Sequence, residues 1–167
     1  MRDYLPLLDR LAPAPAADAV ATMQRVSDAL WDAFSGDFPG SVSWIGFYTW
    51  DAARQDELVL AARRNKPACS PIGLHGACGQ CFIAKRPMIV PDVKTLGANY
   101  VACDPRDQAE VIVPLLNPDG TCWGVLDGDS FDIGAFDVAD ALALAHLLRH
   151  VGLSSGVFTS VADVVVR

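Results

Sequence analysis

Two short apolar segments joined by a tight turn constrain the fold of this chain more than any other feature. Residues 111–116 read Val-Ile-Val-Pro-Leu-Leu, and an apolar side chain at every position is typical of a central strand buried on both faces. The tetrapeptide Asn117–Gly120 is typical of a tight turn, and residues 122–126 return as the partner strand. The sequence therefore predicts a hairpin at the centre of a sheet.

Further strands and helices are predicted on either side of this hairpin. Three short apolar segments predict strands: residues 42–49, 58–62 and 88–90. Apolar residues recur at every third or fourth position between residues 17 and 35, which predicts an amphipathic helix. Asp137 can cap another helix that extends to about His150, and a short helix is expected to end near Lys85.

The order of these elements predicts an α+β domain, in which helices pack on a mostly antiparallel sheet. A length of 167 residues suits a single domain. We expect that domain to span residues 1–167, with an apolar, proline-rich lead over residues 1–16 and a weakly strand-like tail over residues 153–167. Residues 91–106 are predicted to form a long loop, and loops of that length in compact domains are usually functional or disordered.

The charge of the chain narrows the classes of partner. Its net charge is −7, and an acidic surface repels nucleic-acid phosphates and anionic lipids, so we expect no nucleic-acid partner and no membrane partner. The N-terminal residues lack a signal-peptide pattern, and no apolar stretch reaches the roughly 18 residues of a membrane helix. These features predict a cytoplasmic protein, and they leave a small zwitterionic substrate open.

Five cysteines without an export signal are expected to be reduced, and an odd number cannot all pair within one chain. Cys103 lies in the loop 91–106, where the residues alone support a nucleophile and an incidental buried thiol equally. Cys69 is a second loop cysteine, and the nearby Lys66 could lower the pKa of its thiol. An oxidised Cys103 could condense with such a partner.

Cys78 and Cys81 form a C-x-x-C pair, which can be a redox dithiol or half of a zinc site. His75 is near, but two further zinc ligands at suitable spacing are missing, and a Gly-Pro loop precedes the pair where a thioredoxin-like motif needs a strand. We therefore interpret the pair as one functional thiol and one incidental thiol, with no metal. Cys122 lies in a predicted strand, where core packing is the better explanation.

Acidic and aromatic residues stand close to these cysteines in the predicted elements. Glu110 begins the strand after the Cys103 loop, and Asp127 and Asp129 are two residues apart, so they share a face of an extended chain. They could bind a cation or an ammonium group, but Asp-Gly-Asp-Ser is also typical of a solvated turn, which the residues alone favour. Trp44 and Tyr48 share one face of a strand, either in the core or as the wall of a pocket.

Several of these segments together resemble one known family. The motifs are Trp44–Tyr48, Lys66–Cys69, Gly76–Gly79, Pro91–Val93, Ala102–Asp104, Glu110–Pro114 and Gly124–Ser130. In this order, and with these cysteines and acids, the chain resembles the GAF-domain free methionine-(R)-sulfoxide reductases from about Val42 to Leu148. The resemblance implies a GAF fold with a small pocket, and free methionine-(R)-sulfoxide as the substrate.

The resemblance also implies a role for each matching residue. Cys103 would be the nucleophile, Cys69 the main resolving thiol, and Cys78 a second or alternative one. Glu110, Asp127 and Asp129 would hold the substrate ammonium group and help to protonate the sulfoxide oxygen, while Trp44 would pack on the methyl end, with Tyr48 beside it.

The family chemistry also implies which other molecules take part. Thioredoxin would reduce the resulting disulfide, and no metal or organic cofactor would be needed. A homodimer is compatible with this interpretation. The alternative is a non-enzymatic GAF module that binds a small ligand or senses redox state.

Overall fold

A computed structural model describes residues 2–13, 18–100 and 103–167. A seven-stranded sheet forms the centre of the molecule, with the strand order β3-β2-β1-β6-β5-β4-β7. Neighbouring strands are antiparallel except β4 and β7, which are parallel. The strands are β1 (Trp44–Trp50), β2 (Glu57–Arg64), β3 (Ile72–Gly73), β4 (Met88–Val90), β5 (Ala109–Leu116), β6 (Cys122–Ser130) and β7 (Val165–Val166).

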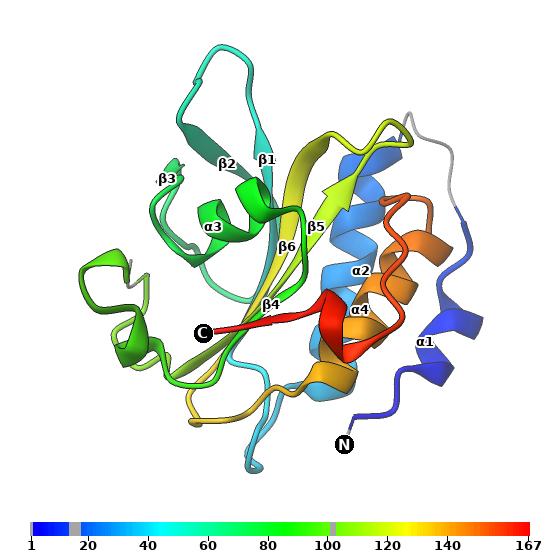
Figure 1. Ribbon diagram of the computed structural model, residues 1–167. Helices are drawn as coiled ribbons and strands as arrows, with labels where there is room; N and C mark the ends of the chain where they lie inside the picture. Colours follow the sequence, from blue (N-terminus) through cyan, green and yellow to red (C-terminus); the bar gives the residue numbers. More distant parts are fainter. Residues whose placement is uncertain (1, 14–17, 101–102) are drawn as a thin grey trace.

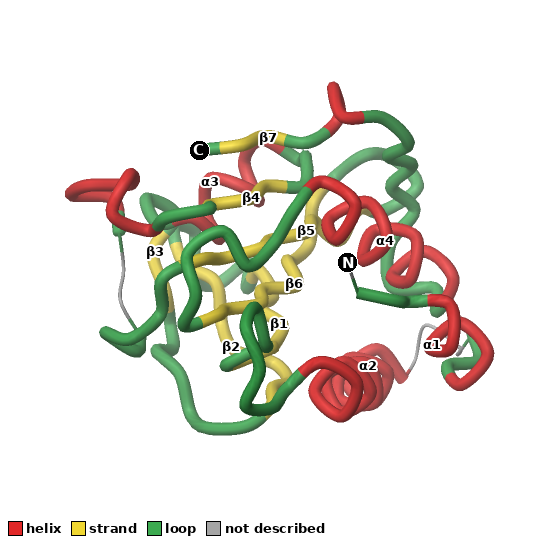
Figure 2. The backbone as a smooth tube through the Cα atoms, turned by 90° about the horizontal axis from the view of Figure 1, so that it is seen from below, coloured by secondary structure: helices red, strands yellow, loops and turns green. Residues whose placement is uncertain are grey.

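Helices cover both faces of this sheet. The α-helices of the described residues are α1 (Leu5–Arg10), α2 (Ala19–Phe34), α3 (Ala77–Ala84) and α4 (Val138–His150), and 3-10 helices span Val93–Asn99 and Val161–Asp163. Helices α2 and α4 lie on one side of the sheet, with α1 outside α4, whereas α3 lies on the opposite side (Figures 1 and 2). The α+β prediction is therefore confirmed.

The predicted central hairpin is confirmed, and its strands are longer than expected. Strands β5 and β6 pair antiparallel from Ala109 opposite Ser130 to Leu116 opposite Cys122. Their connection is closed by a hydrogen bond from Gly120 N to Asn117 O (2.9 Å), and the φ of +79° at Gly120 favours glycine. Because β6 lies between β1 and β5, both of its edges are paired along the strand.

Alternating residues of the strands divide the core into two parts. On the side of α2 and α4, Phe47 of β1 and Leu126 of β6 pack with Met23 and Leu30, two residues of the apolar stripe on α2. That contact confirms the predicted amphipathic helix, which spans Ala19–Phe34 and has Asp18 as its N-cap. On the side of α3, the smaller core contains Trp44 and its neighbours, and this is where the cysteines and acids gather.

The helix cap predicted at Asp137 is confirmed. The backbone N–H of Asp140 donates to the Asp137 side chain (3.0 Å), and the N–H of Asp137 donates to the Asp140 side chain (3.1 Å). The Asp140 carboxylate also accepts from the Arg2 guanidinium (2.8 Å) and from the Tyr4 hydroxyl (2.9 Å). One acidic residue thus caps α4 and holds the N-terminal segment against it.

Three segments contain structure that the sequence did not indicate. The lead over residues 1–16 contains α1, which buries Leu7, and the loop 91–106 contains the 3-10 helix Val93–Asn99. Residues 63–80, for which the sequence predicts no regular structure, contain the end of β2, the short edge strand β3 and the first residues of α3. In the tail over residues 153–167, only Val165–Val166 form a strand, β7, which pairs with β4. Among the described residues, none of the helices combines the length and apolar character needed to cross a membrane.

Candidate functional site

Three neighbouring strands carry the predicted acids and Trp44 to one face of the sheet. Asp129 on β6 lies opposite Trp44 on β1 and also opposite Glu110 on β5, and Asp127 lies opposite Gly46 on β1. Asp127 and Asp129 are each only 9 % exposed. The interpretation of Asp127–Ser130 as a solvated turn is therefore wrong, because strands β1 and β5 pair with both edges of this segment and α3 covers the face.

The buried carboxyl groups resist ionisation. Burial raises the pKa of Asp127 to about 7, with a further increase from Asp107 and an opposing effect from the adjacent Cys78 thiol. The pKa values of Glu110 and Asp129 are raised well above their ordinary values, mainly by burial and secondly by the charge of Asp127. Like charges directly opposite one another destabilise a sheet, so this arrangement opposes folding and suits a site that holds protons or a cation.

One atom of this cluster lacks a partner. Asp127 Oδ1 is buried and accepts no hydrogen bond from any described residue. An unsatisfied buried polar atom costs about 1–3 kcal/mol, and an external donor such as an ammonium group would remove that cost. The cluster is therefore suited to bind a positively charged group of a ligand.

Two aromatic residues form the wall beside the acids. The ring centroids of Trp44 and Tyr48 are 6.0 Å apart. The Trp44 ring lies over Gly46, where any side chain would collide with it. The Trp44 indole N–H donates to the carbonyl of Lys66 (3.0 Å), and the Tyr48 hydroxyl donates to the carbonyl of Cys69 (2.9 Å). The same residues thus form an apolar wall and hold the loop that carries Cys69.

The two loop thiols lie against each other. Cys103 and Cys69 are both exposed. Burial of the inward-facing thiol raises the pKa of Cys103 to about 12, and the next contribution is a hydrogen bond with the Cys69 thiol. The structure therefore brings together two loops whose cysteines are 34 positions apart in the sequence, and burial favours the protonated form of the Cys103 thiol.

The cysteines of the C-x-x-C pair lie in helix α3 and are buried. Cys78 lies beside Asp127. The pKa of the Cys78 thiol is raised well above its ordinary value, mainly by burial and secondly by the charge of the Asp127 carboxylate. The Cys81 thiol points elsewhere and donates to the carbonyl of Arg86 (3.2 Å). Among the described residues, no group of three His, Cys, Asp or Glu side chains is arranged to hold a metal ion. Cys122 is only half-buried, and its thiol contacts the carbonyl of Gly124 (3.2 Å).

Seven of the eight predicted site residues line two adjoining hollows. Tyr48, Cys103 and Asp127 line both hollows, Cys78 and Glu110 line one, and Trp44 and Asp129 line the other. The eighth residue, Cys69, contacts Cys103 beside them. The predicted residues therefore form one site.

Two acidic lining residues were not assigned to the site from the sequence. Asp104 and Asp107 both line the hollow beside Trp44, and each is more than nine-tenths buried. Asp107 accepts a hydrogen bond from the Ser43 hydroxyl (2.9 Å). The available signal was the density of acids that follows Cys103, since Asp104, Asp107 and Glu110 recur at every third residue.

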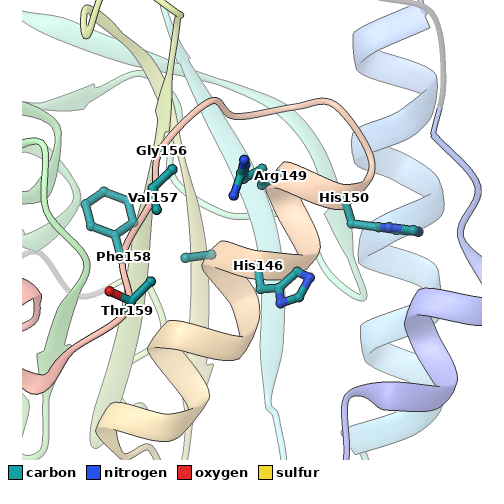
Figure 3. A pocket seen from close by; sticks show the side chains of 8 residues that line it. His146, Arg149, His150, Gly156, Val157, Phe158 and Thr159 are labelled. Atoms are coloured by element: carbon teal, nitrogen blue, oxygen red, sulfur yellow. The ribbon is translucent and has the colours of Figure 1, made fainter.

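A larger cleft elsewhere lacks comparable chemistry. It measures about 320 Å³ and lies between α4 and residues 156–159. Figure 3 shows that His146 and His150 point away from Phe158, so the side chains with titratable groups do not converge. No described cysteine or carboxylate lines it, and the cysteine site remains the candidate functional site.

Comparisons with known proteins agree with this arrangement. The GAF domain family matches residues 6–154. The free methionine-R-sulfoxide reductase of Saccharomyces cerevisiae is 32 % identical over 81 % of this chain and 74 % of its own length. The chain belongs to the GAF-domain free methionine-R-sulfoxide reductase family.

Solved structures of this reductase family have the same fold. The enzyme from Neisseria meningitidis, in complex with its substrate, has a TM-score of 0.72 and 35 % identity, covering 87 % of this chain and 80 % of that chain. The reduced form of the Staphylococcus aureus enzyme also has a TM-score of 0.72, with 26 % identity, covering 90 % and 94 %. The family and fold implied by the sequence motifs are therefore confirmed.

Proposed function

We propose that this protein reduces free methionine-(R)-sulfoxide to methionine, with Cys103 as the nucleophile. The observation that carries the proposal is the convergence of the Cys103 thiol and a buried, partly protonated acid cluster on the same hollows. The relatives named above are reductases of this substrate. A thiol beside a proton donor meets the needs of sulfoxide reduction, because the oxygen must be protonated as it leaves sulfur.

The proposed binding mode follows the polarity of the site. The substrate ammonium group lies against the acids Glu110, Asp127 and Asp129, where it pairs with the unpartnered Asp127 Oδ1. The methyl end lies against Trp44, with Tyr48 beside it. A zwitterion satisfies this site better than an uncharged sulfoxide, because burying charged acids without a partner is costly.

The first chemical step transfers oxygen from substrate to enzyme. The Cys103 sulfur attacks the electrophilic sulfur of the sulfoxide, while a protonated carboxyl of the cluster protonates the oxygen, and the thiol proton returns to that cluster. The hydroxyl then passes from the substrate sulfur to the Cys103 sulfur as the transient S–S bond breaks, so that Cys103 becomes a sulfenic acid and methionine leaves. Cys103 loses two electrons and the substrate sulfur gains them, so this step needs no other reductant.

The second step resolves the sulfenic acid. The Cys69 thiol displaces the hydroxyl of the sulfenic acid, so that a disulfide and a water molecule form. Thioredoxin then reduces the disulfide by thiol–disulfide exchange, which suits a cytoplasmic protein. Cys78 is the alternative resolving thiol, but Cys69 is favoured because it is exposed and already contacts Cys103.

Substrate entry requires the walls of the site to separate. The two hollows measure about 40 and 20 Å³, which is room for a few water molecules. Residues 66–69 and 103–107 form the outer wall and lie outside the α-helices and strands. We infer that residues 103–107 of this wall move outward when the substrate binds.

A coupled assay tests the proposed reaction. The protein is mixed with thioredoxin, thioredoxin reductase, NADPH and free methionine-(R)-sulfoxide, and NADPH oxidation is followed. We expect turnover in the wild type and none in Cys103→Ser. Full activity in that variant, or no turnover with any physiological dithiol, refutes the proposal.

The role of Cys69 is tested with the variant Cys69→Ser. It is expected to release one methionine per molecule and then to recycle slowly. Unchanged steady-state turnover in this variant would assign the resolving role to Cys78 or Cys81.

A further inference from the structure

The residue that follows Cys103 joins the two cysteine loops. Asp104 Oδ1 accepts hydrogen bonds from the backbone N–H and the Nε of Arg106, both at 3.0 Å. Asp104 Oδ2 accepts from Arg106 Nη2 (2.7 Å) and forms an ion pair with Lys66 Nζ. Asp104 itself is only 8 % exposed. One buried carboxylate therefore holds its own loop in shape through Arg106 and reaches the Cys69 loop through Lys66.

Lys66 is a suitable anchor for such a contact because its backbone is fixed. The Lys66 carbonyl accepts the Trp44 hydrogen bond, and the carbonyl of Cys69, three residues later, accepts the Tyr48 hydrogen bond. Strand β1 thus holds the Cys69 loop at two points. A side-chain contact to Lys66 therefore places the Cys103 loop relative to the sheet as well as relative to Cys69.

The ring of Phe131 lies against the two cations that bind Asp104. The Arg106 guanidinium lies 4.6 Å and the Lys66 ammonium 5.3 Å from the centroid of Phe131. Both cations are attracted to the face of the ring, which helps to fix their positions beside Asp104. Arg106 and then Lys66 hold the pKa of Asp104 well below its usual range, so the carboxylate remains charged at any pH where the enzyme works.

We propose that Asp104 is a positioning residue for disulfide formation: through Lys66 and Arg106 it keeps the Cys103 loop against the Cys69 loop. The inference rests on the proposed function and names a residue that acts on the second step. A disulfide requires Cα atoms within about 7 Å. The two loops are far apart in sequence, and Asp104–Lys66 is their charge-assisted contact, which is stronger than a neutral hydrogen bond.

The step that depends on this contact is the condensation of the Cys103 sulfenic acid with the Cys69 thiol. The S–O bond of the sulfenic acid breaks and the S–S bond forms. The hydroxyl leaves with the thiol proton as water. When residues 103–107 move outward for the substrate, the contact ties the Cys103 loop to the anchored Cys69 loop, so that Cys69 remains within reach of the oxidised Cys103.

The test separates the two chemical steps in the variant Asp104→Asn, which keeps the shape of the side chain and loses its charge. The full-length protein reacts with one equivalent of substrate without thioredoxin. Released methionine reports the first step. Mass spectrometry of samples quenched with dimedone, which traps sulfenic acids, or with an alkylating agent, reports the second.

Because Asp104 also lines the hollow proposed to hold the substrate, the two steps are compared as a ratio within each variant. We expect the rate of disulfide formation relative to methionine release to fall roughly tenfold, the size expected when a charge-assisted contact is lost. The dimedone adduct of Cys103 should accumulate. Arg106→Gln is expected to move the ratio of adduct to disulfide in the same direction by a smaller factor. The matched control is Glu57→Gln, which removes an exposed ion pair to Arg54 (3.2 Å) and should change neither step.

Disulfide formation at the wild-type rate in Asp104→Asn would overturn the inference. An equal slowing of both steps together with a lower melting temperature would also overturn it, because that pattern indicates general destabilisation. If Asp104→Asn does not fold, an unchanged ratio of adduct to disulfide in Arg106→Gln counts against the inference. The proposed function fails separately, if Cys103→Ser still releases methionine.

Discussion

The buried carboxyl of Asp127 is expected to make the stability of the protein fall as pH rises. Burial raises its pKa from an ordinary 3.8 to about 7. Below about pH 4 the group carries a proton in both the folded and the unfolded chain, so it contributes no pH dependence. Between about pH 4 and pH 7 the unfolded chain loses this proton while the folded protein keeps it, and the free energy of unfolding decreases. Above about pH 7 both states are ionised and the decrease from this group is complete.

The size of the effect follows from the pKa. Each pKa unit corresponds to about 1.4 kcal/mol, so the difference between 3.8 and about 7 amounts to about 4 kcal/mol for this buried group. The variant Asp127→Asn resembles the protonated carboxyl in shape and cannot ionise. Its stability relative to the wild type should therefore be near zero at about pH 4 and rise towards about 4 kcal/mol at about pH 8.

Urea unfolding of the reduced proteins at several pH values, followed by tryptophan fluorescence, measures this difference. The control is Asp119→Asn, because Asp119 lies in an exposed turn where hydrogen bonds from Thr121 lower its pKa. That variant should gain nothing as pH rises. The reasoning is refuted if the difference between Asp127→Asn and the wild type is independent of pH or decreases with rising pH.

Two further variants test other parts of the structure. Arg2→Met removes a buried partner of Asp140, in an ion pair of 2.8 Å whose side chains are 11 % and 6 % exposed, so the free energy of unfolding measured in urea should fall by about 3 kcal/mol. The control Arg54→Met breaks an exposed ion pair and should lower the free energy of unfolding by about 0.5 kcal/mol or less. Equal losses in the two variants would contradict the role of Arg2. Gly46→Ala places a methyl group where the Trp44 ring lies, and displacement of that ring should lower turnover at least about tenfold. Turnover at the wild-type rate would show that the position of Trp44 is not needed for the reaction.

Local patterns were sufficient for much of the fold. The apolar repeat of α2 and the cap formed by Asp137 and Asp140 depend on residues within one or two helical turns, so the sequence displays them directly. The central hairpin depends on neighbouring segments and on the turn Asn117–Gly120. The order of the cysteine motifs was also sufficient to indicate the family, which the comparisons confirm.

Other features depend on contacts between distant segments. Helix α1 is too short to show a clear apolar repeat, and it is held near α4 by Arg2 and Tyr4, which bind Asp140 more than 130 positions away. The segment Asp127–Ser130 has the composition of a turn, but strands on both sides extend β6 through it. In both places contacts between distant segments determine the structure: they stabilise a helix that the local sequence does not indicate, and they extend a strand through residues with the composition of a turn.

The electrostatics of the site likewise arise only in the folded molecule. By sequence, Cys103 was one of several reduced thiols in loops, and Lys66 was only a cation near Cys69. Folding places Cys103 against Cys69, aligns Asp129 with Glu110 across two strands, and joins Asp104 to Lys66. The sequence by itself thus determined which chemical groups are present and the local elements that carry them. Only the tertiary structure decided which of them meet and how easily they ionise, because proximity and burial are properties of the packed chain.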